Sequence, residues 1–136
     1  MKKTVTGIKK ALEDYFISHP EIILVYIFGS IAQGRSNKLS DIDIAILVDN
    51  KKIQEKKYRY GYKAAIITDL IQLLKTNEVD LVILNEANPF LRHRVLYHGK
   101  LIHSKDEVIR INFQVDTIRE YNDVKYIYKI HSGANQ

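Results

Sequence analysis

The chain has 136 residues, the usual length of a single domain. Its hydrophobic fraction of 46%, together with only 2 Pro and 6 Gly, excludes a disordered or fibrous chain. It contains no Cys, which excludes disulfides, thiolate zinc sites and a cysteine nucleophile. A net charge of +5 favours contact with polyanions such as ATP, nucleic acid or an acidic partner, but a value this modest more often reflects a solvated surface.

The N-terminal half contains two short apolar runs that predict strands. Apolar residues at helical spacing predict a first helix over about residues 4–18, which ends before Pro20. Residues 22–28 are wholly apolar and predict a buried strand, and residues 42–48 predict a second strand. The small, polar segment 31–39 between them indicates a short helix followed by a loop.

Neither apolar run is long enough to cross a membrane, and the basic N-terminus leads into no apolar segment. We therefore expect an untargeted protein of the cytoplasm. The absence of Cys suits such a reducing compartment.

The C-terminal half alternates helices and strands. In chain order we expect a long helix, a strand, a short helix, a short strand and a last helix, over about residues 53–75, 79–84, 90–97, 100–103 and 105–128. In the last helix we expect Ser104 and Glu107 to form the N-terminal capping box. Its buried face is expected to be an apolar stripe made by Val108, Ile111, Val115 and Ile118.

The alternation predicts one α/β (α+β) domain, a small mixed sheet flanked by helices. It spans residues 1–136, with a core to about residue 104 followed by the last helix.

Three acidic residues stand at the starts of predicted strands. Asp41 and Asp43 are two residues apart, so in a strand their carboxylates lie on the same face. Two adjacent carboxylates repel each other, and a bound divalent cation offsets that repulsion. Mg²⁺ prefers such hard oxygen ligands and shares them with substrate phosphates. If Asp80 supplies a third carboxylate from the next strand, two ions can bridge the oxygens of a phosphoryl displacement.

Gly29-Ser30 ends the first strand and opens the short helix. Glycine lets the backbone approach a phosphate closely, and the N–H groups of a first helical turn favour an anion. The Ser30 hydroxyl is a donor for a phosphate oxygen. Arg35 and Lys38, in the loop before the acidic pair, are candidate ligands for a triphosphate.

These two segments together resemble a family signature. Residues 29–35, GSIAQGR, and residues 40–45, SDIDIA, are similar to the motif of the DNA polymerase beta-like nucleotidyltransferases, and within them to the stand-alone minimal nucleotidyltransferases. The resemblance implies a nucleotidyltransferase fold with ATP as substrate. It also implies Gly29 and Ser30 on the nucleotide phosphates, Asp41 and Asp43 on two Mg²⁺ ions, and Asp80 as the third acid and candidate general base. Many members have Arg where this chain has Gln33, which leaves the role of Arg35 open.

The same resemblance extends to a partner. Minimal nucleotidyltransferases of this size resemble the MntA-type antitoxins of type VII toxin–antitoxin pairs, whose partner is an all-helical HEPN ribonuclease toxin. It implies that this chain transfers AMP from ATP to a tyrosine of such a toxin and so silences it. Nucleic acid is not the expected substrate.

Two alternatives stay open. One is an antitoxin that neutralises by binding alone, through a surface such as the last helix with its residues Tyr121, Tyr126 and Tyr128. The other is transfer to RNA or to a small molecule, which would require an acceptor-binding domain that the sequence does not indicate. The neighbouring residues Arg92, His93 and Arg94 are expected to lie on a solvated helix face.

Overall fold

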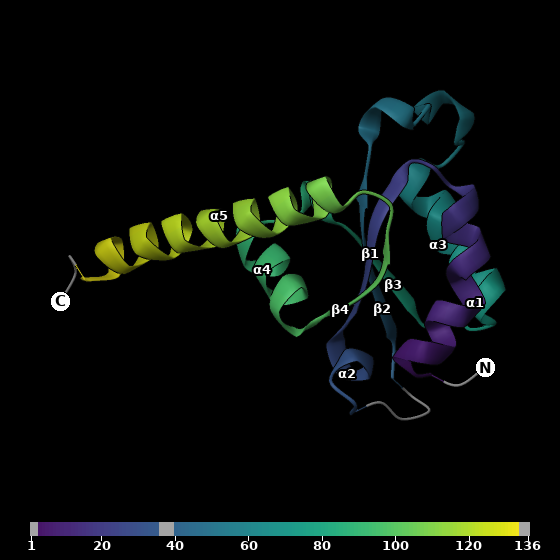
Figure 1. The fold of residues 1–136 in the computed structure, drawn as a ribbon, viewed down its shortest axis with the longest axis horizontal. Helices are drawn as coiled ribbons and strands as arrows, with labels where there is room; N and C mark the ends of the chain where they lie inside the picture. The colour runs from purple at the N-terminus through teal and green to yellow at the C-terminus, as the bar shows by residue number, and fades with distance from the viewer. Residues whose placement is uncertain (1–2, 36–39, 134–136) are drawn as a thin grey trace.

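Four strands form one mixed sheet at the centre of the fold (Figure 1). The computed structural model describes residues 3–35 and 40–133. The strands are β1 (Ile22–Phe28), β2 (Ile42–Val48), β3 (Val79–Ile83) and β4 (Lys100–Ser104), and their spatial order is β3-β2-β1-β4. β1 pairs antiparallel with β2 and with β4, whereas β2 and β3 run parallel. The expected small mixed sheet is confirmed.

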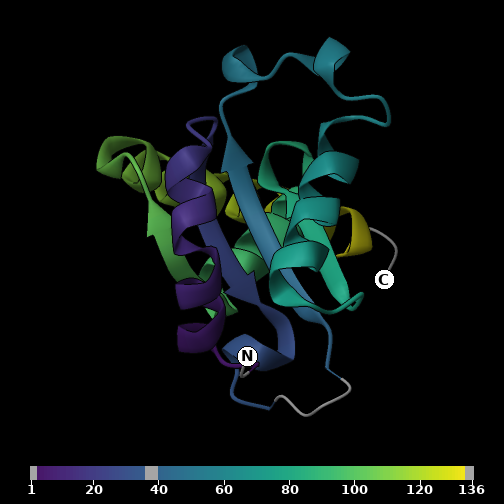
Figure 2. The ribbon, with the colours of Figure 1, turned by 90° about the vertical axis from the view of Figure 1, so that its right-hand side faces the viewer.

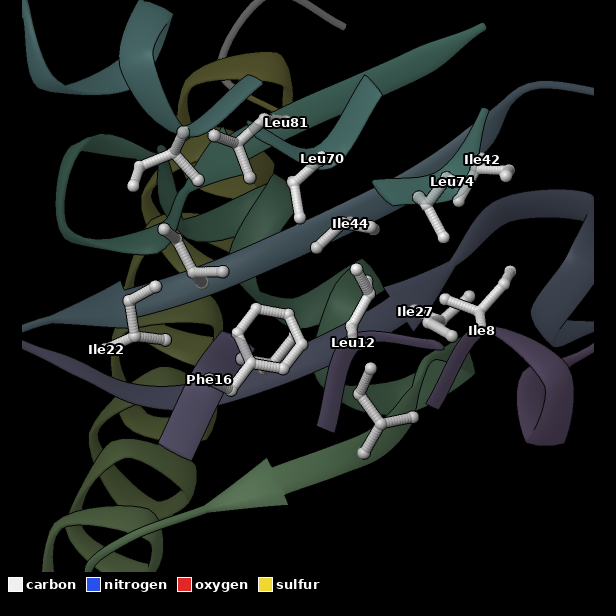
Figure 3. Packing of buried hydrophobic residues seen from close by; sticks show 14 of the residues in the cluster. Ile8, Leu12, Phe16, Ile22, Ile27, Ile42, Ile44, Leu70, Leu74 and Leu81 are labelled. Atoms are coloured by element: carbon white, nitrogen blue, oxygen red, sulfur yellow. The ribbon is translucent and has the colours of Figure 1, made fainter. Parts of the chain in front are cut away.

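Helices α1 (Val5–Ser18) and α3 (Tyr62–Leu74) cover one face of the sheet (Figures 1 and 2). The Thr4 side chain caps α1 by accepting a hydrogen bond from the N–H of Gly7 at 3.1 Å. Figure 3 shows hydrophobic side chains of both helices packed against those of the strands. Among them are Ile8, Leu12, Phe16, Ile22, Ile27, Ile42, Ile44, Leu70, Leu74 and Leu81. Each fully buried side chain of this kind stabilises the fold by about 1.5–3 kcal/mol.

Helices α4 (Pro89–His98) and α5 (Glu107–Gly133) cover the opposite face. A smaller apolar cluster lies beneath them; it consists of Leu24, Tyr26, Ala45, Leu84, Val95 and Phe113. Arg92 ties α4 in place, because its guanidinium donates to the carbonyls of Leu84 at 2.7 Å and Asn85 at 2.9 Å and pairs with Glu120 of α5 at 3.3 Å. The expectation of a solvated Arg92 is therefore wrong.

The helix expected from residue 53 begins later than the pattern indicates. The chain first makes two short 3-10 turns, Asn50–Lys52 and Glu55–Lys57, and α3 begins only at Tyr62. Gly61 has a φ of +92°, which a right-handed α-helix does not contain. The helix therefore cannot extend back through this glycine.

The last helix differs from the expectation in its buried face, its cap and its length. Its expected core stripe is largely exposed: Val108 is 67% exposed, Ile111 50%, Val115 46% and Ile118 40%. The buried residues are instead Phe113 and Thr117, on the side of α5 that meets α4 and the sheet. Both stripes have helical spacing, so the sequence pattern alone does not distinguish them.

The N-terminal turn of α5 is capped by Asp106, whose carboxylate accepts from the N–H groups of Val108 at 2.9 Å and Ile109 at 3.1 Å. Ser104 instead donates its hydroxyl to the Glu107 carboxylate at 3.2 Å. The helix continues to Gly133 and projects away from the sheet (Figure 1). Within residues 3–35 and 40–133, no helix is both long and apolar enough to cross a membrane.

The turn from α4 into β4 has no room for a side chain at Gly99. A Cβ there would overlap the carbonyl oxygen of Val95 and lie 3.1 Å from that of Ile27. We predict that Gly99→Ala lowers the free energy of unfolding by about 1–3 kcal/mol, the usual cost of overpacking. Urea denaturation measures the change. The neighbouring exposed variant Lys100→Ala serves as the control, and an equal loss in both would contradict this steric account.

Candidate active site

The three predicted acids lie together at one end of the β2–β3 pair. Asp43 and Asp80 are directly opposite each other in the parallel register, and Asp41 comes immediately before β2. Because strand residues alternate between faces, Ile42 and Ile44 pack toward α1 and α3 while Asp43 faces the side that α4 and α5 cover. The structure therefore brings Asp80 beside the acidic pair, as predicted.

The three carboxylates influence one another electrostatically. Burial raises the pKa of Asp43 from its ordinary value to about 6, and the charges of Asp80 and Asp41 contribute in the same direction. Asp43 is half-buried, whereas Asp41 and Asp80 are exposed. Ionisation of Asp43 is therefore unfavourable, and a bound cation would lower its electrostatic free energy.

The three acids fit a magnesium site whose coordination shell is completed by substrate phosphates. Among the described residues, no three Asp, Glu, His or Cys side chains converge on one point where they could hold a metal ion. Mg²⁺, however, usually takes one or two carboxylates and completes its shell with waters and substrate phosphates. Asp41, Asp43 and Asp80 suit that arrangement, in which two of the carboxylates at a time would bind one ion.

Gly29 lies directly against the Asp43 carboxylate. It has a φ of +74°, and a Cβ added to it would overlap Asp43 Oδ2 and lie 3.1 Å from Cγ. Phe28, the residue before it, is opposite Asp43 in the β1–β2 register. Only glycine satisfies both the backbone conformation and this close approach. The turn at the end of β1 and the acid of β2 thus form one structural unit.

The other predicted phosphate ligands are placed unequally. Ser30 lies in the first turn of α2 (Gly29–Ala32), one residue from the Asp43 contact, and is half-buried. Arg35 lies beyond the end of α2, where its N–H donates to the Ser30 carbonyl at 2.8 Å and its guanidinium donates to the Gln33 side chain. Lys38 lies outside the described residues. The structure therefore brings Gly29 and Ser30 to the acids and directs the Arg35 side chain toward Gln33.

Lys3, for which the sequence pattern predicts no role, lies at the same end of the sheet. Its ammonium donates to the Ser40 carbonyl at 2.9 Å and pairs with Glu78 at 3.4 Å. The Glu78 carbonyl in turn accepts from the N–H of Ile42 at 2.8 Å. Lys3 thus links the segments that lead into β2 and β3. The only signal in the sequence was the basic N-terminus, which has no spacing that points to these partners.

The candidate active site is thus a glycine turn packed against one of three neighbouring carboxylates. The family model described as "Polymerase beta, Nucleotidyltransferase" matches residues 10–108, and the chain belongs to this family. Over 78% of its length the chain is 31% identical to the protein adenylyltransferase MntA of Shewanella oneidensis, and the match covers 70% of that relative.

Solved structures agree with this assignment. A chain of a toxin–antitoxin crystal structure with AMP-PNP superposes with a TM-score of 0.70 at 28% identity, and the match covers 98% of each chain. A complex of tri-AMPylated Shewanella oneidensis HEPN toxin with MNT antitoxin gives a TM-score of 0.64 at 26% identity, with coverage of 95% of this chain and 92% of the other. The expected nucleotidyltransferase fold is confirmed.

The contact between Gly29 and Asp43 can be tested with a matched pair of glycines. Gly29 and Gly34 have nearly equal φ values of +74° and +72°, but a Cβ at Gly34 meets none of the described residues within 4 Å. We predict that Gly29→Ala lowers nucleotidyl transfer by roughly 100-fold, because it displaces a reacting-site carboxylate by about 1 Å. Gly34→Ala carries the same backbone strain without that displacement. Equal activity in the two variants would show that the Asp43 contact is unimportant.

The raised pKa of Asp43 makes the metal-free protein less stable as pH rises. Below about pH 3 the residue is protonated in both the folded and the unfolded chain; as pH rises to about 6, the unfolded chain ionises first, and folded stability falls. Asp43→Asn removes this loss. With EDTA present, we expect the variant to melt at a higher temperature than the parent at pH 7.5 and at a similar temperature at about pH 3. A difference in melting temperature that does not change with pH would show that the ionisation of Asp43 is not its cause.

Proposed function

We propose that this chain is a protein adenylyltransferase that transfers AMP from ATP to a tyrosine of a HEPN ribonuclease toxin and thereby acts as its antitoxin. The observation that carries the chemistry is the Gly29 turn packed against Asp43, with Asp80 opposite Asp43 and Asp41 before it. The family and the MntA relative support the reaction class. The complexes of similar chains with toxin, AMP-PNP and an AMPylated HEPN protein support the donor and the partner.

In the proposed reaction the tyrosine oxygen attacks the α-phosphorus of ATP. A bond forms between that oxygen and the phosphorus, the bond from the phosphorus to the bridging oxygen breaks, and pyrophosphate leaves. We assign the acceptance of the phenolic proton to Asp80; its exposure and its position beside Asp43 in the sheet support this role. Gly29 and Ser30 hold the phosphates through backbone and hydroxyl groups.

Mg²⁺, as two ions, would be held by Asp41, Asp43 and Asp80 together with the triphosphate. When bound, it neutralises the charge that develops on the phosphoryl oxygens. Without it, the three carboxylates would repel the phosphates of ATP. Arg35 and Lys38 remain candidate triphosphate ligands in this proposal; Arg35 would need its side chain to leave Gln33.

In this proposal residues 1–136 act as one nucleotidyltransferase domain of the cytoplasm, with the toxin as a stable partner. The projecting part of α5 offers a surface for that partner. Its exposed apolar side chains include Tyr126, Ile127, Tyr128 and Ile130, which are 66%, 54%, 69% and 50% exposed. The same surface favours the second candidate, an antitoxin that neutralises by binding without transfer.

A double substitution separates the two candidates. We predict that Asp41→Asn with Asp43→Asn abolishes transfer of label from [α-³²P]ATP to a HEPN toxin that binds this chain, because the metal ligands are lost. It is also expected to leave the two proteins associated. An enzyme then fails to protect cells from the toxin, whereas a protein that neutralises by binding alone still protects them.

The matched control is Glu13→Gln with Asp14→Asn, which removes the same charge from the exposed surface of α1, on the opposite face of the sheet from α5. The control should label the toxin like the parent chain. Label that appears on RNA or on a small molecule, with none on the toxin, would contradict the proposed acceptor while retaining the reaction class.

A further inference from the structure

A cavity lies on the side of the sheet toward which Asp43 points. It has a volume of about 440 Å³ and is lined by Gln33, Phe90, His93, Arg94, His98 and Tyr121. These residues come from the end of α2, from α4 and from α5, three elements that Figure 1 shows around the same side of the sheet. The volume lies within the range of about 300–1,000 Å³ that is typical of small-molecule sites.

Gln33 connects this cavity to the catalytic turn. It is the C-cap of α2, and its N–H donates to the Gly29 carbonyl at 3.2 Å. The four residues of α2 rise only about 6 Å along the helix axis. The cavity therefore begins one short helix away from Gly29, on the face of the sheet toward which Asp43 points.

The walls of the cavity combine aromatic rings with hydrogen-bond donors. The rings of His93 and Tyr121 stack with centroids 3.6 Å apart and an interplanar angle of 11°, and Phe90 meets Tyr121 edge-on at 5.9 Å. Phe90 is 46% exposed, so part of its ring surface is accessible to a ligand. Arg94 and His98, both exposed, supply groups for an anion.

The composition of the walls narrows the ligand class. Among the described residues that line the cavity, none carries a carboxylate. Burial and the nearby His98 and Lys125 lower the pKa of His93, which keeps its imidazole neutral and suited to ring stacking. Aromatic surfaces bind nucleobases by stacking, and a guanidinium binds a phosphate through paired donors.

We infer that this cavity binds an adenosine 5′-phosphate group, with Phe90 against the base and Arg94 on the phosphate. The inference rests on the proposed function for its choice of adenine. The group has two sources in that reaction. One is the AMP portion of the donor ATP. The other is an AMP already attached to the toxin, as the tri-AMPylated toxin of a similar complex suggests, where it would serve as the next acceptor.

Binding of AMP to the isolated full-length chain tests the inference without the toxin. The measurement is equilibrium dialysis with labelled AMP in the presence of EDTA, so that no metal ion joins the phosphate to the acids. We expect Phe90→Ala and Arg94→Gln each to weaken AMP binding by about fivefold or more, at the lower end of the effect of losing a stacked base. Binding of ribose 5-phosphate should be weakened by Arg94→Gln and unaffected by Phe90→Ala.

Two variants of α5 outside the cavity serve as controls. Ile111→Ala removes an apolar side chain that is 50% exposed, and Arg119→Gln removes an exposed guanidinium. Both should bind AMP like the parent chain. Arg94→Lys retains the positive charge but loses the planar guanidinium, so reduced binding by this variant cannot be ascribed to a loss of surface charge. Thermal melting of each variant verifies that the fold is intact.

Kinetics with the toxin identifies the source of the AMP group. A KM for ATP raised about fivefold or more with kcat retained assigns the cavity to the donor nucleotide. An unchanged KM, with intact mass showing toxin that stops at one AMP, assigns it to the attached acceptor nucleotide. Equal AMP affinity in the cavity variants and the controls, or no AMP binding by the parent chain, would overturn the inference. If the cavity variants lose AMP binding but the parent chain puts no label on the toxin, the cavity is still an AMP site and the proposed function is contradicted.

Discussion

The site depends on the contact between Gly29 and the Asp43 carboxylate. An antiparallel pair brings the end of β1 against the start of β2, so the turn after β1 must pass beside the acid. Only glycine fits at position 29, because the backbone there has a positive φ and the Asp43 carboxylate oxygen occupies the space that a Cβ would need. A single local constraint thereby fixes the turn at the end of β1 and the Asp43 carboxylate relative to each other.

The rest of the fold places that unit at an accessible edge. α1 and α3 bury one face of the sheet in a large aliphatic core, and the acids lie on the opposite face because of strand alternation. α4 and α5 cover that face only in part. Arg92 holds α4 by bonds to two carbonyls and to Glu120, which leaves the other side of α4 to line the cavity near Gln33. Rigid packing on one face thus supports an open site on the other.

The sequence alone was sufficient for the strands, because they follow from local pattern. Runs of β-branched residues predict β1 and β2 at their observed bounds, and the period of two places Asp43 on the face away from the large apolar core. The buried face of α5 was not predictable in this way, since Phe113 and the stripe with Ile111 have equivalent helical spacing. The cavity was also missed, because Gln33, Phe90 and Tyr121 meet only through tertiary packing.

The parallel pairing of β2 with β3 has a consequence for how the protein acquires activity. Asp43 and Asp80 are neighbours in the sheet, but the whole α3 crossover separates them along the chain. Closing so long a loop is entropically costly and slow compared with forming a local turn. During synthesis the glycine turn and the first two acids emerge well before the third acid. A nascent chain that ends within α3 therefore lacks Asp80, and the group of three acids is completed only after the α3 crossover has been made and β3 has paired with β2.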